Sequence, residues 1–472
     1  MAVKHEGGAR PAPEPGRALA WVEKNFEGHL ADLQGYLKVD NLITNRERCH
    51  EMARRLRSEI EALGGRAAIL DYGDLPFVYG GIDAGAKRTL VVYRNYDIVP
   101  PEGADWSAPP YAGRVRSIEG LGDCIVSRGV CDPKGPLVLL LRAVEAWVRT
   151  EAKPPVNLVF LLEGDEQLGS PTLGKVIRER HQDLKLAHGV LHPRLCQGRS
   201  GTPVLPLGTK GVLLLDLICA GGSWGGPTRT SIHSGNAAWV ASPAWRMVRA
   251  LGTLVDAAEK VRIPGFHDDV VATIDDDAGE RLTGIEDQYE YLKGRHVLRF
   301  KHDLPPTALG RRYLKAPTFN LGNLLIHSSR PWSQFLLPCE VRAQIDIRLV
   351  PDQDPDAVVA ALRRHLAKEG FPDIEVVTRL AYRPWSIDRG HPLVGTARRT
   401  YRAFGMEAEI HPSTGTSHSF SLFDDLGLPL VVAGLGSGGR AFHSSEYASI
   451  AGLREYEKSM VRFMHEFARE GA

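Results

Sequence analysis

The sequence predicts an α/β fold in two domains, an alternating layer of strands and helices interrupted by an inserted α+β block. With 472 residues, the chain is too long for a single hydrophobic core. In residues 1–207 and again in residues 384–472, short apolar runs alternate with helical patterns, as in a sheet covered by helices. Residues 208–383 break this alternation and form the expected insert.

Hydrophobic periodicity places the elements of the first segment. We expect helices over residues 18–37, 46–63 and 137–149, and strands over residues 90–93, 156–162 and 190–191. In the second of these helices apolar residues recur at the helical spacing, and the strands are short runs with few polar residues. The segment therefore reads as alternating α/β structure.

The insert has longer elements and a less regular middle. We expect strands over residues 212–220 and 341–350 and helices over residues 241–259 and 355–368. Residues 262–330 between them are rich in loop-forming residues. The α/β segment then resumes near residue 384 and ends in a helix over residues 453–469.

Composition indicates an ordinary enzyme rather than a nucleic-acid-binding or membrane protein. The 58 basic and 57 acidic residues leave a formal net charge of +1, so neither nucleic acid nor a membrane surface is an expected partner. The N-terminal residues lack the apolar core of a secretory signal, and the six cysteines show no paired spacing. We expect a cytoplasmic protein with reduced thiols.

The end of the first strand is the most informative point of the sequence. Side chains alternate along a strand, so Asn95 and Asp97 project to one face and Arg94 to the other. Asp97 could therefore orient whatever residue 95 binds.

This stretch is the first of eight motifs that resemble, in the same order, those of one enzyme family. They lie at residues 95–97, 106–111, 127–135, 161–170, 189–192, 232–235, 346–351 and 442–446. Together they resemble the carnosine dipeptidase, carboxypeptidase G and acetylornithine deacetylase family of di-zinc hydrolases. The resemblance implies a catalytic domain with a mixed central sheet flanked by helices (zinc aminopeptidase-like) and an inserted α+β lid/dimerisation domain. It also implies a homodimer, in which the strand over residues 212–220 could extend a sheet across the two-fold axis.

Three of the five metal-ligand positions that the resemblance implies are substituted. One ion would lie among Asp132, Gln167 and His443, and the other among Asn95, Asp132 and His192. Amides are weak zinc ligands, so Asn95 and Gln167 are left as substrate-binding candidates. The strong donors that remain, Asp132, His192 and His443, predict at most one divalent ion, with zinc expected, or none. His192 could instead be an ordinary hydrogen-bonding residue.

The resemblance also implies the catalytic roles. Glu166 is at the position of the general base that activates water, with Asp97 as a further catalytic residue. In a second register Asp165 would be the base and Glu166 a metal ligand, but the ungapped match at Gly169 and Ser170 argues against it. His233 would bind the substrate and polarise its carbonyl group, from its own chain or from a partner subunit, and Arg348 would bind a substrate carboxylate.

The resulting prediction is an amidohydrolase or peptidase acting on a small carboxylate-bearing amide, such as a dipeptide or an N-acyl amino acid. One alternative is a metal-independent isomerase, cyclase or acyl transferase that uses Glu166 for proton transfer. The other is a non-catalytic binding protein. Metal content discriminates the first two, and substitution of Glu166 discriminates both from the third.

Overall fold

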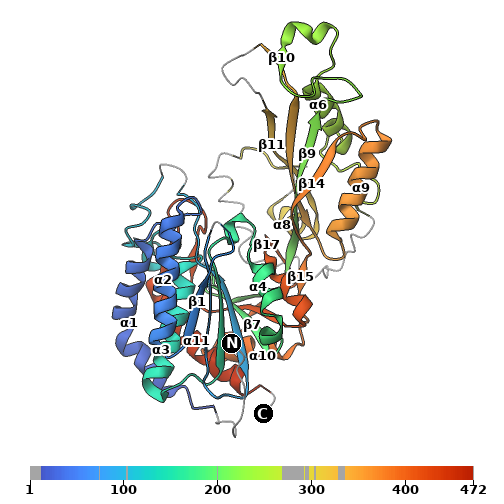
Figure 1. The fold of residues 1–472 in the computed structure, drawn as a ribbon. Coiled ribbons are helices and arrows are strands. Elements are labelled where there is room, and N and C mark those ends of the chain that lie inside the picture. The colour runs from blue at the N-terminus through green and yellow to red at the C-terminus, as the bar shows by residue number, and fades with distance from the viewer. Residues whose placement is uncertain are drawn as a thin grey trace.

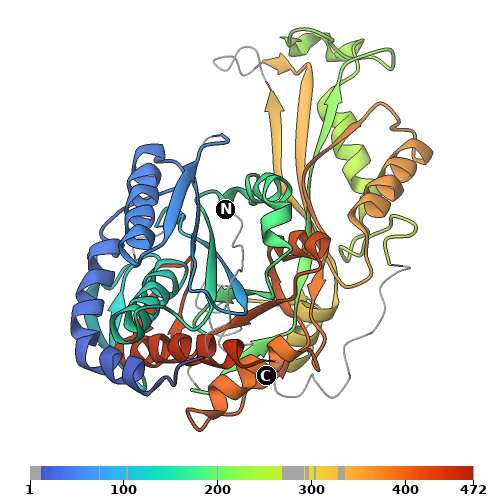
Figure 2. The ribbon, with the colours of Figure 1, turned by 60° about the horizontal axis from the view of Figure 1, so that its bottom comes forward.

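The structure of the chain is a computed structural model. It describes residues 12–73, 75–101, 105–198, 200–267, 292, 297–301, 305–327 and 335–470. The chain forms two lobes, each built around its own β-sheet (Figure 1). A second view, turned by 60°, shows the same two lobes (Figure 2).

The first lobe is built on a six-stranded sheet with the order β1-β2-β6-β3-β7-β18. Its strands are β1 (Arg66–Leu70), β2 (Phe77–Ile82), β6 (Asn157–Glu163), β3 (Thr89–Asn95), β7 (Gly189–Pro193) and β18 (Leu430–Ala433). β3 runs parallel to β6 and β7, and β18 runs parallel to β7, whereas β2 is antiparallel to β1 and β6. The sheet is therefore mixed, as predicted. Since parallel strands end at the same edge, β3, β6 and β7 bring Asn95, Glu163 and His192 to one region.

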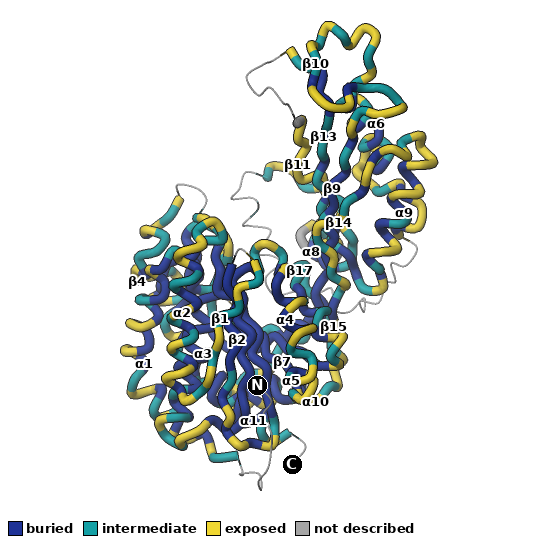
Figure 3. Tube along the Cα trace, viewed as in Figure 1, coloured by how far each residue is buried: buried dark blue, intermediate teal, exposed yellow. Residues whose placement is uncertain are grey.

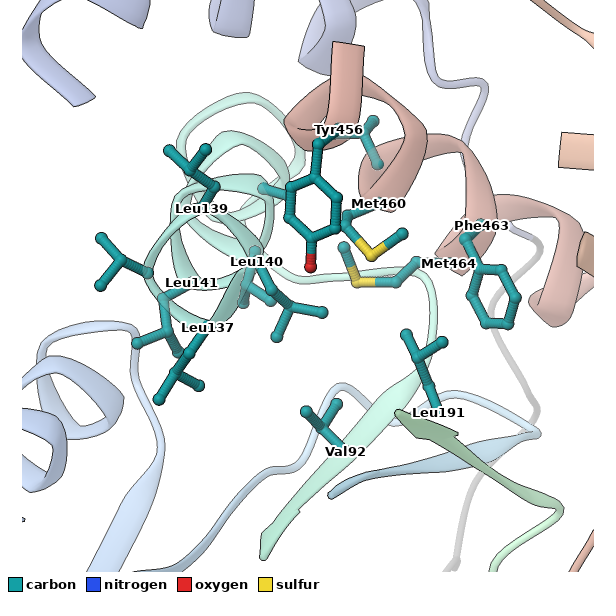
Figure 4. Packing of buried hydrophobic residues seen from close by; sticks show 14 of the residues in the cluster. Val92, Leu137, Leu139, Leu140, Leu141, Leu191, Tyr456, Met460, Phe463 and Met464 are labelled. Atoms are coloured by element: carbon teal, nitrogen blue, oxygen red, sulfur yellow. The ribbon is translucent and has the colours of Figure 1, made fainter. Parts of the chain in front are cut away.

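Long helices cover one face of this sheet. They are α1 (Gly16–Leu37), α2 (Arg46–Ala62), α3 (Lys134–Glu151), α10 (Pro392–Arg402) and α11 (Ile450–Ala468). Their apolar residues form one core cluster with Val92 and Leu191 of the sheet. Figure 4 shows Met460 and Met464 of α11 between the leucines of α3 and these two strand residues. Each such side chain contributes about 1.5–3 kcal/mol when fully buried, so this layer holds the strand ends in place.

Shorter elements cover the opposite face. They are α4 (Leu173–Glu179), α5 (His181–Leu184) and the 3-10 helix η5 (Ser419–Leu426). Phe420 and Phe423 of η5 pack with Val91 and Tyr93 of β3 in a separate core cluster. The sheet is thus buried on both faces except at its edge strand β1, and Figure 3 shows the inner strands as buried.

The second lobe is a sheet with the order β11-β13-β9-β14. Its strands are β11 (Thr318–His327), β13 (Glu340–Leu349), β9 (Gly208–Ala220) and β14 (Glu375–Tyr382). Burial alternates residue by residue along β13, because α6 (Pro243–Leu254) and α9 (Pro355–Lys368) cover only one face. Asp354 caps α9 by accepting hydrogen bonds from two backbone N–H groups of its first turn.

Two expectations about the insert are wrong. The strand expected over residues 212–220 is β9, which has β13 on one side and β14 on the other. It cannot extend the sheet across a two-fold axis, and β11 and β14 are the edge strands of the sheet instead. The stretch over residues 262–330 also holds α8 (Pro306–Lys315) and β11, so it is less loop-rich than predicted. The domain boundaries next to residues 208 and 384 stay predictions.

Short strands join the two lobes. β15 (Trp385–Ser386) and β17 (Thr414–Ser417) pair with the first residues of β9, beside the first lobe. The remaining elements are β4 (Arg114–Ile118), β5 (Gly122–Val126), β8 (Val204–Pro206), β10 (Ile232–His233), β12 (Leu336–Leu337), β16 (Glu409–His411), β19 (Gly438–Gly439), β20 (Tyr447–Ser449), η1 (Glu166–Leu168) and η2 (Ser234–Ala238). Among the described helices, none is long and apolar enough to cross a membrane.

Candidate active site

Asp97 organises the end of β3. Its side chain is fully buried, and its Oδ1 accepts a hydrogen bond of 3.0 Å from the amide of Asn95. Its Oδ2 accepts a 2.8 Å hydrogen bond from the backbone N–H of Gln167. Burial raises the pKa of Asp97 well above its ordinary value, and the nearby charge of Glu166 raises it further. Asp97 therefore fixes both amide residues, as expected for an orienting group.

Glu166, in η1, is the carboxylate around which the predicted site residues gather. The amide Nδ2 of Asn95 lies 3.4 Å from Glu166 Oε2, and the amide of Gln167 donates to the same oxygen. The other oxygen faces His418, whose Nδ1 is 3.7 Å away. The Glu166 side chain is 21% exposed, so a small molecule can reach it. The two amides thus present N–H donors to a carboxylate rather than oxygens to a cation.

The second register is not favoured by this geometry. Asp165 is buried, and its Oδ2 accepts a hydrogen bond from Thr172, on the chain after the η1 turn. Burial raises the pKa of Asp165 to about 6. Glu166, and not Asp165, therefore contacts Asn95 and Gln167.

Arg94 occupies the space between two predicted metal ligands. Its side chain is 1% exposed; one guanidinium nitrogen, Nη1, lies 2.6 Å from His192 Nε2, and Nη2 donates to Asp132 Oδ1. A second arginine, Arg194, places its Nε 3.7 Å from the other oxygen of Asp132. Asp132 thus has a cation at each of its two oxygens.

These contacts set the charges of both groups. Burial alone would raise the pKa of Asp132, but the positive charges of Arg94 and Arg194 outweigh it and hold the pKa below its ordinary value. Burial, followed by the charge of Arg94, lowers the pKa of His192 well below its ordinary value. Asp132 is therefore an anion and His192 is neutral at neutral pH, with its Nε2 accepting from Arg94.

The arrangement does not fit a metal ion held by Asp132 and His192. A guanidinium already uses the donor atoms that would face such an ion. Within the ranges that the structure describes, no three His, Cys, Asp or Glu side chains gather closely enough to hold a metal. The predicted set of Asp132, His192 and His443 is accordingly not assembled as a group of three, and the predicted ion count stays a prediction.

A buried carboxylate holds the loop that carries Asp132. Oε1 of Glu446 accepts hydrogen bonds from the backbone N–H groups of Cys131 and Asp132, at 2.9 and 3.0 Å. Its Oε2 accepts from the backbone of Gly129 and from Arg128, at 3.0 and 3.1 Å. Burial raises the pKa of Glu446 to about 7. This clamp also positions the chain beside His443, whose backbone oxygen accepts from Arg128 at 3.2 Å.

The two predicted site residues of the second lobe lie at its opposite ends. His233 is exposed on β10, which lies at the tip of the lobe farthest from the first sheet in both Figure 1 and Figure 2. The structure therefore does not bring it to Glu166 within one chain.

Arg348 lies at the end of the second lobe nearer the first sheet. It is opposite Val212 on β9, which is opposite Tyr382 on β14. Tyr382 in turn donates a 2.5 Å hydrogen bond to the backbone oxygen of Gly169, three positions after Glu166. Arg348 is also close enough to Lys210 that, after burial, its charge helps to lower the pKa of that lysine to about 8.

Three residues of the site were missed from the sequence: Arg94, Arg194 and His418. Strand alternation directed Arg94 away from Asn95, but the alternation rule does not consider how far a long side chain reaches. Arg194 lies two positions after His192, so a count of charged residues near the motifs would have drawn attention to it. His418 lies in a Ser- and Thr-rich stretch with no periodic signal.

The two-lobed fold and a carboxylate-centred site at the strand ends define a hydrolase of the peptidase class, and comparisons with known proteins agree. The chain belongs to the peptidase family M20/M25/M40, whose profile matches residues 91–466. The family resemblance and the hydrolase class predicted from the sequence are thereby confirmed.

Individual relatives cover most of the chain. It is 25% identical over 450 residues to the Beta-Ala-His dipeptidase of Homo sapiens, covering 88% of this chain and 85% of that protein. It is 27% identical over 454 residues to a Cys-Gly metallodipeptidase of Schizosaccharomyces pombe, covering 90% and 92%. Among solved structures, an M20 family metallo-carboxypeptidase from Sulfolobus solfataricus superposes with a TM-score of 0.78 at 26% identity, covering 93% of this chain and 99% of that one. A dipeptidase of Saccharomyces cerevisiae has a TM-score of 0.79 at 19% identity, covering 97% and 99%, and shows the same fold.

Proposed function

We propose that the protein hydrolyses the amide bond of a small carboxylate-bearing substrate, a dipeptide or an N-acyl amino acid, with Glu166 as the general base. The observation that carries the proposal is the Glu166 carboxylate, which is partly exposed at the end of the sheet and held by Asn95, Gln167 and His418. A general base needs a fixed position and access to the reacting molecule, and Glu166 has both. The two curated relatives described above are dipeptidases, which supports the substrate class.

In this proposal Asp97 is a positioning residue. It holds the Asn95 amide and the Gln167 backbone, and through them it fixes the Oε2 side of Glu166. The Oε1 side is left to face His418 and the substrate. Asn95 and Gln167 then contact the substrate's polar groups with whatever hydrogen-bonding capacity Glu166 leaves free.

The substrate carboxylate would bind at the near end of the second lobe. Arg348 is paired with Asp346, with both guanidinium contacts at 3.1 Å, and its side chain is 38% exposed. A planar guanidinium suits two-point binding of a carboxylate, and the neighbouring Lys210 adds positive charge to the same region.

His233 enters this scheme only through a second copy of the chain, since β10 lies far from the first sheet. We therefore include a homodimer in the proposal, with β11 at the interface. In the described ranges β11 pairs on one side only, with β13. Its exposed residues include Leu324, Leu325 and Ile326, between 42% and 58% exposed. An edge strand with apolar side chains is suited to pairing with its own copy across a two-fold axis.

The proposal keeps a cytoplasmic location and at most one divalent ion per chain. A second candidate function is acyl transfer or cyclisation on the same scaffold. The contact of Arg94 with both Asp132 and His192 favours it, because Arg94 occupies the space in which a metal ion would hold water. Proton transfer then depends on Glu166, and a substrate amine can replace water as the nucleophile.

The test is a substrate panel with matched variants. The purified protein is incubated with dipeptides, including β-Ala-His and Cys-Gly, and with N-acyl amino acids, and the released or newly joined products are separated and weighed by mass spectrometry. Glu166→Gln should lower kcat by about a hundred- to ten-thousand-fold with little change in KM. Arg348→Ala should instead raise KM, and only for substrates with a free carboxylate.

Asp165→Asn is the matched control, because asparagine can still accept the hydrogen bond from Thr172. It should keep most of the turnover. If Asp165→Asn abolished turnover while Glu166→Gln kept it, Asp165 would be the base and this proposal would be wrong. The binding-protein alternative would be favoured by two results together: the wild type turns over none of the substrates, and the Glu166→Gln variant binds them normally.

A further inference from the structure

The hydrolysis proposed above gives Arg94 itself no task. A guanidinium is always charged in proteins, and burying it is costly unless each side meets a partner. Here the side chain is 1% exposed, with Asp132 on one nitrogen and His192 on another. Such a residue is held in a specific place by a specific pair of partners.

Asp132 faces two guanidinium groups, so its negative charge is compensated without a metal ion. Among the residues that the structure describes, Asp132 is the carboxylate that contacts Arg94, and Arg194 approaches its other oxygen at 3.7 Å. His192 meets Arg94 with an unprotonated nitrogen, 2.6 Å away. The positive charge that compensates Asp132 is therefore supplied by arginines of the chain itself.

The two arginines differ in exposure. The Arg194 side chain is 30% exposed, whereas Arg94 is closed off from solvent. Arg94 is therefore a positioning residue that cannot touch a substrate. Arg194 can place a positive charge where a carbonyl oxygen becomes negative during amide cleavage or acyl transfer.

We propose that the guanidinium of Arg94 stands permanently in the place of a metal ion between Asp132 and His192, and that Arg194 presents the exposed positive charge to the substrate's carbonyl oxygen. The centre then works without a divalent ion. This goes beyond the proposed function, since it holds for hydrolysis and for acyl transfer alike. It also accounts for the amides of Asn95 and Gln167, which direct N–H groups at Glu166, whereas metal ligands would direct lone pairs at an ion.

The first part of the test needs no substrate, so it is independent of the proposed function. The protein as purified is first analysed for bound metals. It is then treated with a chelator and melted with EDTA, with added zinc or with added manganese. We expect no stoichiometric divalent ion and the same Tm in all three conditions. One tightly bound ion per chain, whose removal lowers Tm, would overturn the proposal.

Variants separate a general loss of stability from the specific role. Arg94→Ala should lower Tm, because it leaves the Asp132 carboxylate buried without its closest partner. Arg94→Ala combined with Asp132→Asn should recover part of that loss. Arg142→Ala is the matched control, since Arg142 is also largely buried and pairs with Glu59 and Glu145 on the helical side of the sheet. Its Tm loss should not be recovered by Asp132→Asn.

The second part uses the substrate found in the panel. Arg194→Ala should lower kcat about a hundred- to a thousand-fold, as for loss of one group that stabilises an oxyanion, and Arg194→Lys should restore part of it. Turnover of the wild type should be the same before and after chelation. Loss of turnover on chelation, with recovery on adding zinc, would contradict the proposal even if the protein hydrolyses the expected substrates.

Discussion

Restoring the substituted ligand positions should not restore metal binding while Arg94 is present. The perturbation is the triple variant Asn95→His, Gln167→Glu and His192→Asp, compared with the same variant carrying Arg94→Ala in addition. An ion bound to Asp132 and residue 192 would lie roughly 4–5 Å from the guanidinium, because Arg94 contacts both side chains directly. At an effective dielectric constant of about 20, a dication and a guanidinium at that separation repel by roughly 7–8 kcal/mol.

That repulsion would cancel about half or more of the binding free energy of an ordinary zinc site. Structural zinc sites bind with about 10–16 kcal/mol, and every 1.4 kcal/mol is about a tenfold change in affinity. The triple variant should therefore bind zinc weakly, and the fourth substitution should tighten binding by several orders of magnitude. Calorimetric titration of chelator-treated protein with zinc measures both affinities. Equal, tight binding by the triple and quadruple variants would refute the reasoning, since it would mean that Arg94 does not compete with the ion.

Two further predictions concern stability and assembly. Asp132→Asn should destabilise the protein by about 3–5 kcal/mol at neutral pH, because it leaves Arg94 buried without its anion. Since the pKa of Asp132 is held below its ordinary value of 3.8, this ion pair contributes fully above that value and is lost as the pH falls through the lower folded value. The Tm difference between wild type and variant should therefore be constant above about pH 5 and close in more acidic solution; a gap that stays open at low pH would count against the pairing. Leu325→Lys, on the exposed edge strand β11, should convert a homodimer to a monomer by light scattering, whereas Val115→Lys, 41% exposed on β4 of the first lobe, should not. A wild-type protein that is already monomeric at micromolar concentration would remove the basis for this interface.

Elements with a strong apolar period could be predicted from the sequence almost to the residue. The helix expected over residues 355–368 is α9 (Pro355–Lys368), and the strand expected over residues 156–162 is β6 (Asn157–Glu163). Periodicity reports which faces of an element are buried, but it does not report what lies beside a strand. Periodicity therefore does not distinguish a central strand such as β9 from an edge strand. The edge strand β11 lacks a regular burial pattern because it is exposed along most of its length.

The site shows a similar division. Asn95, Asp97 and Glu166 come from separate motifs and lie in contact, because strands that run parallel bring their ends together whatever the intervening sequence. The ungapped match at Gly169 and Ser170 favours Glu166 over Asp165 from the sequence, but the direction of each side chain in the tight 3-10 turn is visible only in the structure. Strand alternation alone would leave Arg94 out of the site, although the long side chain of a residue near the end of a strand can reach groups beyond that end.

The pairing of β9 has a mechanical consequence. This one strand runs from the first lobe, where its initial residues pair with β15 and β17, into the centre of the second lobe's sheet. His418 directly follows β17. Hydrogen-bonded strands move together, so we expect a tilt of the second lobe to be transmitted through β9 to β17. That movement would shift the imidazole of His418 relative to Glu166. Closure of the lobes around a substrate and adjustment of the catalytic carboxylate would then be one movement rather than two.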